Sequence, residues 1–173
     1  NLVKRNFHAE APGLLWLTDI SEFPADDGKI YFSALVDCFD GKIVGATTSR
    51  HPNQQLADDC LKQAFENNAP PDPAKLVIHS DRGCHYRGNS WIQASQDIGF
   101  TRSMSKKGCS PDNSACEGLF GRMKNEMFYG RKWPHCDELE QAIHEYVGFY
   151  NEHRIKLEFD GLSINQRRRE LLL

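Results

Sequence analysis

The hydrophobic and polar positions of this chain predict strands in its first part and helices in its second. Stretches rich in strand-forming residues lie at 14–20, 30–39 and 42–49, and Asp-Gly at 40–41 predicts a hairpin between the last two. Helical spacing of apolar residues follows at 53–68, 88–99, 113–128 and 137–154. Shorter strands are predicted between these helices, at 76–81 and 100–105. The resulting order, β-β-β-α-β-α-β-α-α, predicts an α/β fold with one mixed sheet and helices on its faces.

The 173 residues suit one domain with a single continuous core. Residues 1–13 are polar and predict an N-terminal arm or linker remnant, ahead of a folded domain over residues 14–173. No apolar run approaches the roughly 20 residues of a membrane span, so we expect no membrane association and a cytoplasmic location. The six cysteines are scattered without a CxxC pair, which favours buried free thiols. The alternative is a mixed zinc site drawn from His79, Cys84, His85, Cys109 and Cys116.

Charge is unevenly distributed along the chain. The net charge of −3 gives no general indication of a nucleic-acid binder. Residues 101–134, however, carry 7 basic and 3 acidic side chains, whereas the segments on either side are net negative. Contacts with phosphate would therefore centre on this block, and the alternative is an ordinary solvated face.

Three carboxylates are the candidates for chemistry. Asp19 and Asp81 each follow an apolar run, and we expect each to lie at the end of a strand, where sites of open α/β sheets gather. Glu117 lies off the apolar stripe of its predicted helix, with Lys124 seven residues later on the same face. Local alternatives exist: each Asp can bond within a turn, and Ser114 with Glu117 matches a capping box. If the three acids converge, they need a cation, and oxygen ligands select Mg²⁺ or Mn²⁺.

The segments WLTDISEF, LVIHSDRGCHY and SMSKKGCSPDNSACEGLFGRMKNE resemble the integrase-core domain of bacterial insertion-sequence transposases. The resemblance is to the IS-three group, whose transposase is of the OrfB type. That family carries an Asp, Asp, Glu triad with 35 residues between the second Asp and the Glu, and 35 residues separate Asp81 from Glu117. The basic residue that the family has seven positions after the Glu is matched by Lys124. His85 stands where the family often has Gln.

The resemblance implies an RNase H-like fold with a mixed five-stranded sheet flanked by helices. It implies a polynucleotidyl transferase that cleaves and joins DNA strands during transposition by two-metal-ion phosphoryl transfer. Asp19, Asp81 and Glu117 would be the catalytic residues and the ligands of two Mg²⁺ or Mn²⁺ ions. Lys124, Lys106 and Lys107 would contact DNA phosphates.

The partners implied are DNA, as element ends and target, and further copies of the chain in a homo-oligomer on DNA. The family's upstream helix-turn-helix region is absent from this sequence, and the location implied is the bacterial cytoplasm, at the nucleoid during activity. Two alternatives remain: an RNase H-like nuclease that does not join strands, and an inactive DNA-binding or assembly module. We expect a structural role for His79, and packing roles for Trp16, Trp91 and Trp133.

Overall fold

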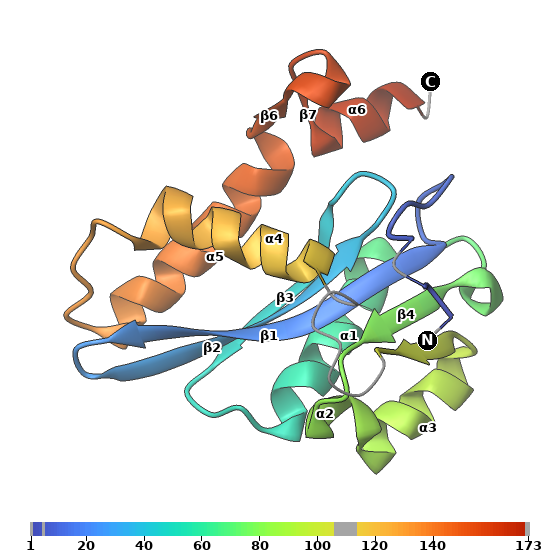
Figure 1. The fold of residues 1–173 in the computed structure, drawn as a ribbon, viewed down its shortest axis with the longest axis horizontal. Coiled ribbons are helices and arrows are strands. Elements are labelled where there is room, and N and C mark those ends of the chain that lie inside the picture. The colour runs from blue at the N-terminus through green and yellow to red at the C-terminus, as the bar shows by residue number, and fades with distance from the viewer. Residues whose placement is uncertain (1, 5, 106–113, 172–173) are drawn as a thin grey trace.

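A mixed five-stranded sheet forms the centre of the computed structural model, which describes residues 2–4, 6–105 and 114–171 (Figure 1). The strand order is β3-β2-β1-β4-β5. The strands β1, β2 and β3 form an antiparallel meander, and β4 and β5 run parallel to β1. Their bounds are Leu15–Ala25 for β1, Gly28–Asp37 for β2, Ile43–Ser49 for β3, Val77–Ser80 for β4 and Thr101–Met104 for β5.

Helices cover both faces of the sheet (Figure 1). Each face has its own buried core, so the expectation of a single continuous core was wrong, because the sheet separates the two apolar clusters. The first face carries α1 (Gln54–Asn68), α2 (Cys84–Arg87) and α3 (Asn89–Ile98). The second carries α4 (Ser114–Met123) and α5 (Cys136–Glu152). The alternation of β1 side chains serves both cores, because Trp16 points into the first and Leu17 into the second. The predicted mixed sheet with helices on its faces is confirmed.

Several short elements complete the chain. They are η1 (Pro73–Lys75), β6 (Ile155–Lys156), η4 (Leu157–Phe159), β7 (Leu162–Ser163) and α6 (Ile164–Leu171). The sequence pattern did not predict them, because two or three residues show no recognisable period and α6 buries only Ile164. The strands β6 and β7 pair with each other, outside the central sheet.

The first strand is longer than predicted. It continues to Ala25, so Asp19 lies inside β1 and not at its end. The reason is that β2 pairs with β1 along its length, with Asp19 opposite Ala34 and Ala25 opposite Gly28. The parallel neighbour β4 stops at Ser80, so Asp19 lies at the end of the parallel ladder rather than of the strand.

The predicted helix over 113–128 changes its winding partway. It is α-helical to Met123 and continues as the π-helix η3 (Lys124–Phe128). The described α-helical part runs from Ser114, and Glu117 lies in its first turn.

Residues of the predicted arm contact the rest of the molecule. The Phe7 ring lies edge-on to His79, with 6.4 Å between ring centroids. The backbone N–H of Leu2 donates to Ser103 Oγ at 3.0 Å, and Ala9 is buried. No helix in the described part of the chain is long and apolar enough to cross a membrane.

Candidate active site

The register of two parallel strands brings Asp19 and Asp81 to neighbouring positions. The last pair in the β1–β4 ladder is Thr18 opposite Ser80, so Asp19 and Asp81 are the next residue on each strand path. Because side chains alternate along a strand, both follow Leu17 and His79 to the face covered by α4. Two residues with 61 others between them in the sequence thus meet at the end of the parallel ladder.

Both aspartates are half-buried and held by backbone N–H donors. Asp19 Oδ1 accepts from the N–H of Ile20 at 2.8 Å, and Asp81 Oδ1 accepts from the N–H of Gly83 at 2.8 Å. A Cβ at position 83 would lie 2.9 Å from Asp81 Oδ1, so glycine leaves room for this turn. Both carboxylates line one cavity of about 350 Å³, together with Tyr86. Asp81 therefore bonds within its own turn, as the local alternative predicted, and also lines a cavity with Asp19.

Glu117 reaches the same region from α4. It is exposed in the first turn of the helix, and α4 packs against β1. The neighbouring Cys116 is buried, and burial raises the pKa of its thiol well above the usual range. The negative charges of Asp19, Asp81 and Glu117 raise that pKa further, so all three carboxylates lie within electrostatic reach of one sulfur.

The contact of Lys124 with β1 shows how the helix that carries Glu117 is aligned with that strand. The Lys124 Nζ lies 5.0 Å from the centroid of the Phe23 ring, a buried residue of β1. From Glu117 and from Asp19, α4 and β1 both run toward the β1–β2 turn (Figure 1). Seven residues of helix separate Lys124 from Glu117, about 10 Å of rise. Four residues of strand separate Phe23 from Asp19, about 13 Å. Glu117 therefore lies near the level of Asp19.

The described side chains do not form a ready-made metal cage. Among residues 2–4, 6–105 and 114–171, no group of three or more His, Cys, Asp and Glu side chains is arranged to hold a metal ion. Of the cysteines considered for a mixed zinc site, Cys116 is buried and Cys84 is exposed, and both are free thiols; Cys109 lies outside the described residues. Lys106 and Lys107 also lie outside them.

The histidines beside the aspartates have local partners. His79 is fully buried, with Nδ1 2.8 Å from Ser103 Oγ and Nε2 3.3 Å from Ser105 Oγ. His85 lines the aspartate cavity, and its Nε2 lies 2.8 Å from the carbonyl oxygen of Pro52. The contacts of His79 agree with the structural role expected for it.

The three tryptophans pack within the molecule, as predicted. Trp16 and Trp91 are buried in the first core. Trp133 is partly buried, stacks on Phe128 at an interplanar angle of 3°, and donates from Nε1 to the Phe128 carbonyl oxygen at 3.1 Å.

Sequence reasoning missed Tyr86. Burial raises the pKa of its hydroxyl well above the usual range, the hydrogen bond with Thr18 lowers it, and the charges of Asp19 and Asp81 raise it again. The two hydroxyl oxygens of Tyr86 and Thr18 are 3.4 Å apart. Tyr86 thus forms the wall of the aspartate cavity. Its place five residues after Asp81 was the available signal, but one aromatic residue in a four-residue helix has no period to recognise.

Comparison with solved structures defines the fold class. The chain superimposes on the HTLV-2 integrase catalytic core domain, solved in complex with magnesium, with a TM-score of 0.70. That match has 16% identity and covers 91% of this chain and 97% of the other. A chain of the simian T-cell lymphotropic virus intasome gives a TM-score of 0.73 at 17% identity, covering 86% of this chain and 52% of that one. The fold is RNase H-like, as the resemblance implied.

Sequence comparison identifies the family. Two models described as the integrase core domain match residues 9–110 and 117–172. A Haemophilus influenzae protein named as an uncharacterized transposase-like protein is 38% identical over 172 residues, covering 99% of this chain and 78% of its own length. A Shigella flexneri protein named as a probable transposase for insertion sequence element IS1353 is 47% identical over 94% of this chain. The chain belongs to the integrase core domain family, and it spans about a third (32%) of the IS1353 relative.

Proposed function

We propose that this chain is the catalytic core of a DNA transposase, which cleaves and joins DNA strands by phosphoryl transfer. The observation that carries the proposal is the placement of Asp19 and Asp81 side by side at the end of the β1–β4 ladder. Glu117 lies in the first turn of α4, and its charge acts on the same Cys116 thiol as the charges of the two aspartates. The family and its named transposases supply the reaction class.

The acids fit a divalent metal by the chemistry of their donors. All three offer carboxylate oxygens, which suit Mg²⁺ or Mn²⁺. The magnesium of the HTLV-2 integrase core was found on the same fold. We propose that Asp19, Asp81 and Glu117 hold two such ions, with Glu117 moving toward the aspartates on binding. Two bound ions would supply activation of the attacking hydroxyl and charge stabilisation at the leaving oxygen.

The remaining residues position the substrate. The N–H groups of Ile20 and Gly83 hold one oxygen of each aspartate and so fix the direction of both carboxylates. Tyr86 closes the cavity wall and limits the entry of water beneath them. Lys124, seven residues after Glu117 at the start of η3, holds its ammonium over the Phe23 ring, and we propose that it contacts a DNA phosphate. Lys106 and Lys107 would do the same from the segment before α4.

The proposed partners are the ends of an insertion element, the target DNA and further copies of the chain. The IS1353 relative extends well beyond the matched region, which leaves room there for a separate DNA-reading part. The simian virus neighbour is part of an intasome, which supports the proposal of an oligomer on DNA. We place this activity in the bacterial cytoplasm, at the nucleoid.

The test is an assay on duplex DNA with free 3′-hydroxyl ends and Mn²⁺, in which cut and joined products are scored separately. We expect Glu117→Gln to remove strand joining by at least about 100-fold, because it deletes one anionic ligand while keeping the side-chain shape. Glu138→Gln is the matched control, since Glu138 is also an exposed acid in the first turn of a helix. Cut but unjoined products from the unaltered chain would favour the nuclease alternative.

A second measurement tests metal binding without activity. Mn²⁺ should raise the thermal unfolding temperature of the unaltered chain, because a ligand that binds only the folded state stabilises it. The Asp81→Asn variant should lose that increase, and Glu138→Gln should keep it. An equal increase in all three proteins would contradict the assignment of Asp81 as a ligand.

A further inference from the structure

A large cavity lies beside the candidate active site and has no role in the proposed chemistry. Its volume is about 660 Å³. The N-terminal arm, the β2–β3 turn, α4 and the C-terminal segment form its walls, and Leu17 lies among its lining residues, two positions before Asp19 on the same face of β1. Gly118, the neighbour of Glu117 in sequence, lines the cavity as well. A ligand in this cavity would therefore extend toward the carboxylates.

Most acids that line the cavity already have cationic partners. Asp37 and Asp40 bind the Arg168 guanidinium at 3.0 Å and 2.6 Å. Glu158 pairs with Lys156 at 3.4 Å. Only the exposed Glu10 lines the cavity without an ion pair among the described residues. Neither of the lining cations Arg122 and Arg167 therefore forms an ion pair with Asp37, Asp40 or Glu158.

Arg167 is held in a fixed position by aromatic rings. Its Cζ lies 4.1 Å from the centroid of Phe159 and 5.2 Å from that of Phe39. A guanidinium stacked on rings keeps the N–H donors on its edge available for an anion. No carboxylate forms an ion pair with Arg167 in the part of the chain that the structure describes.

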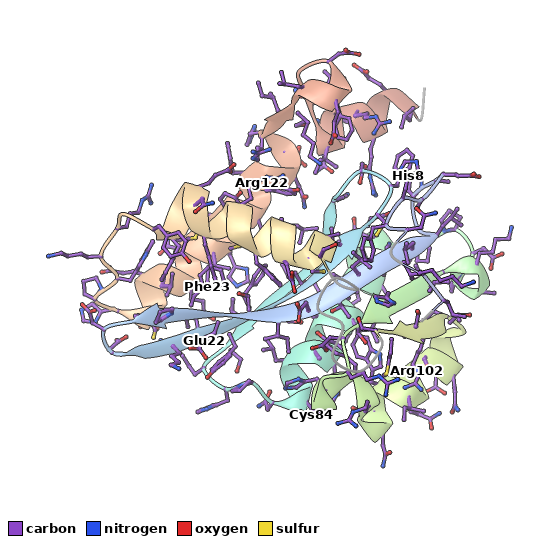
Figure 2. All side chains as sticks on the ribbon, viewed as in Figure 1. His8, Glu22, Phe23, Cys84, Arg102 and Arg122 are labelled. Atoms are coloured by element: carbon purple, nitrogen blue, oxygen red, sulfur yellow. The ribbon has the colours of Figure 1, made fainter. Side chains whose placement is uncertain are left out.

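Arg122 reaches the cavity from α4. Figure 2 shows it on the edge of the helix that faces the C-terminal segment, whereas Glu22 and Cys84 lie on the other side in this view. Its charge lowers the pKa of the Tyr150 hydroxyl, against the larger effect of burial, which raises it. Within the described residues it also has no ion-paired carboxylate. Gly118, four residues before Arg122 on α4, offers an open helix surface in the same cavity, because a Cβ there would meet no atom within 4 Å.

We propose that this cavity binds the phosphodiester backbone of DNA, with Arg122 and Arg167 each contacting a phosphate. Guanidinium groups bind phosphate through paired N–H donors, and an open helix face lets a backbone approach closely. The inference rests on the proposed function, since the cavity begins one residue from Glu117. An acidic peptide would be the rival ligand. It would not explain why the cavity lies next to Glu117, the proposed catalytic residue.

The test measures DNA binding by fluorescence anisotropy across a salt series from about 50 to 200 mM. Each lost phosphate contact makes the slope of log affinity against log salt shallower by about 0.9. We expect this change for Arg122→Gln and for Arg167→Gln, and about twice the change for the double variant. Arg169→Gln is the matched control, because Arg169 is on the same helix and pairs with Glu152 at 3.5 Å. It should leave the slope unchanged.

Two further variants cover the case in which the loss of Arg167 disturbs folding. Arg167→Lys keeps the charge and should keep the slope. Gly118→Glu places a carboxylate at the open helix face and should weaken binding at low salt, whereas Gly148→Glu, at an equally open position on α5, should not. If the double Arg variant binds DNA with the affinity and slope of the unaltered chain, the inference fails.

The outcomes separate this inference from the proposed function. Asp81→Asn should bind DNA as the unaltered chain does and fail only in strand joining. Strand joining that persists in the double Arg variant with unchanged binding would leave the function standing and overturn the cavity assignment. Binding of an acidic peptide in preference to DNA, lost on Arg167→Gln, would also overturn it. An unaltered chain that neither binds nor joins DNA would overturn both.

Discussion

Glu117 and Glu126 lie nine residues apart on one continuous helical segment, yet their surroundings differ. Glu126 accepts hydrogen bonds from Arg154 Nη2 at 2.6 Å and from the Tyr146 hydroxyl at 2.7 Å. The Arg154 guanidinium lowers the pKa of Glu126, and burial opposes this effect. No ion pair involves Glu117 among the described residues, so only Glu117 remains available to a ligand.

The surroundings of Glu126 predict a pH-dependent contribution to stability. Its pKa is lowered from 4.5 in the folded state, so the contribution is present above pH 4.5 and is lost as pH falls through the folded value. Urea unfolding should show Glu126→Gln less stable than the unaltered chain at pH 7, by up to about 1 kcal/mol because the pair is largely exposed. The difference should begin to shrink as pH falls below about 4.5 and should vanish once pH is below the folded-state pKa. A difference that grows on acidification would contradict this, and Glu138→Gln serves as the control.

At the scale of elements, the approach of α1 to β3 depends on one glycine. A Cβ at Gly45 would lie 2.7 Å from the carbonyl oxygen of Cys60 and 3.0 Å from Ala64 Cβ. The close contact buries Cys60, and burial raises the pKa of its thiol to about 11. The strand and helix can be this close only where no side chain separates them.

Alanine substitutions at two glycines should therefore have opposite effects. We expect Gly45→Ala to destabilise the fold by about 1–3 kcal/mol, because backbone must move to relieve the overlap. Gly148→Ala, in the middle of α5 with open space around it, should stabilise by about 0.5–1 kcal/mol through helix propensity. Thermal or urea unfolding measures both. A neutral Gly45→Ala would show that α1 can shift without loss of packing.

At the scale of the whole molecule, Arg168 joins segments from both ends of the chain. It binds Asp37 and Asp40, whose side chains are almost fully buried at the β2–β3 turn. Asp37 also accepts the N–H of Gly13 at 2.9 Å, so the N-terminal segment shares the same carboxylate. The C-terminal helix α6 is thereby fixed to the sheet, and it carries Arg167 into the large cavity.

Substitution of Arg168 should lower the free energy of unfolding far more than substitution of its neighbour Arg169. Arg168→Gln leaves two buried carboxylates without a cation, and we expect a loss of about 3–5 kcal/mol. Arg169→Gln breaks an exposed pair, so its effect should stay below about 1 kcal/mol. Urea unfolding of both variants gives the comparison. Similar small losses would show that water or Lys42 compensates the two carboxylates.

Much of the fold was predictable from the sequence, and the exceptions have physical reasons. The long helices and the β2–β3 hairpin followed from apolar spacing and the Asp-Gly turn. The true extent of β1 did not, because its second half is held by pairing with β2 rather than by its own apolar pattern. The start of α5 also depends on a distant residue, since Asp27 Oδ1 accepts the Cys136 N–H at 2.8 Å.

The sequence by itself determined the order of the five sheet strands and the long helices, the three candidate acids and the 35-residue separation of Asp81 from Glu117. These are local properties of residue type and spacing. Only the tertiary structure decided that Asp19 adjoins Asp81, because that depends on the register between two parallel strands. It also decided that Arg122 and Arg167, 45 positions apart, share a cavity whose acids are largely paired. Whether a carboxylate is neutralised by a cation depends on contacts between distant segments. A count of charges along the sequence cannot show such contacts.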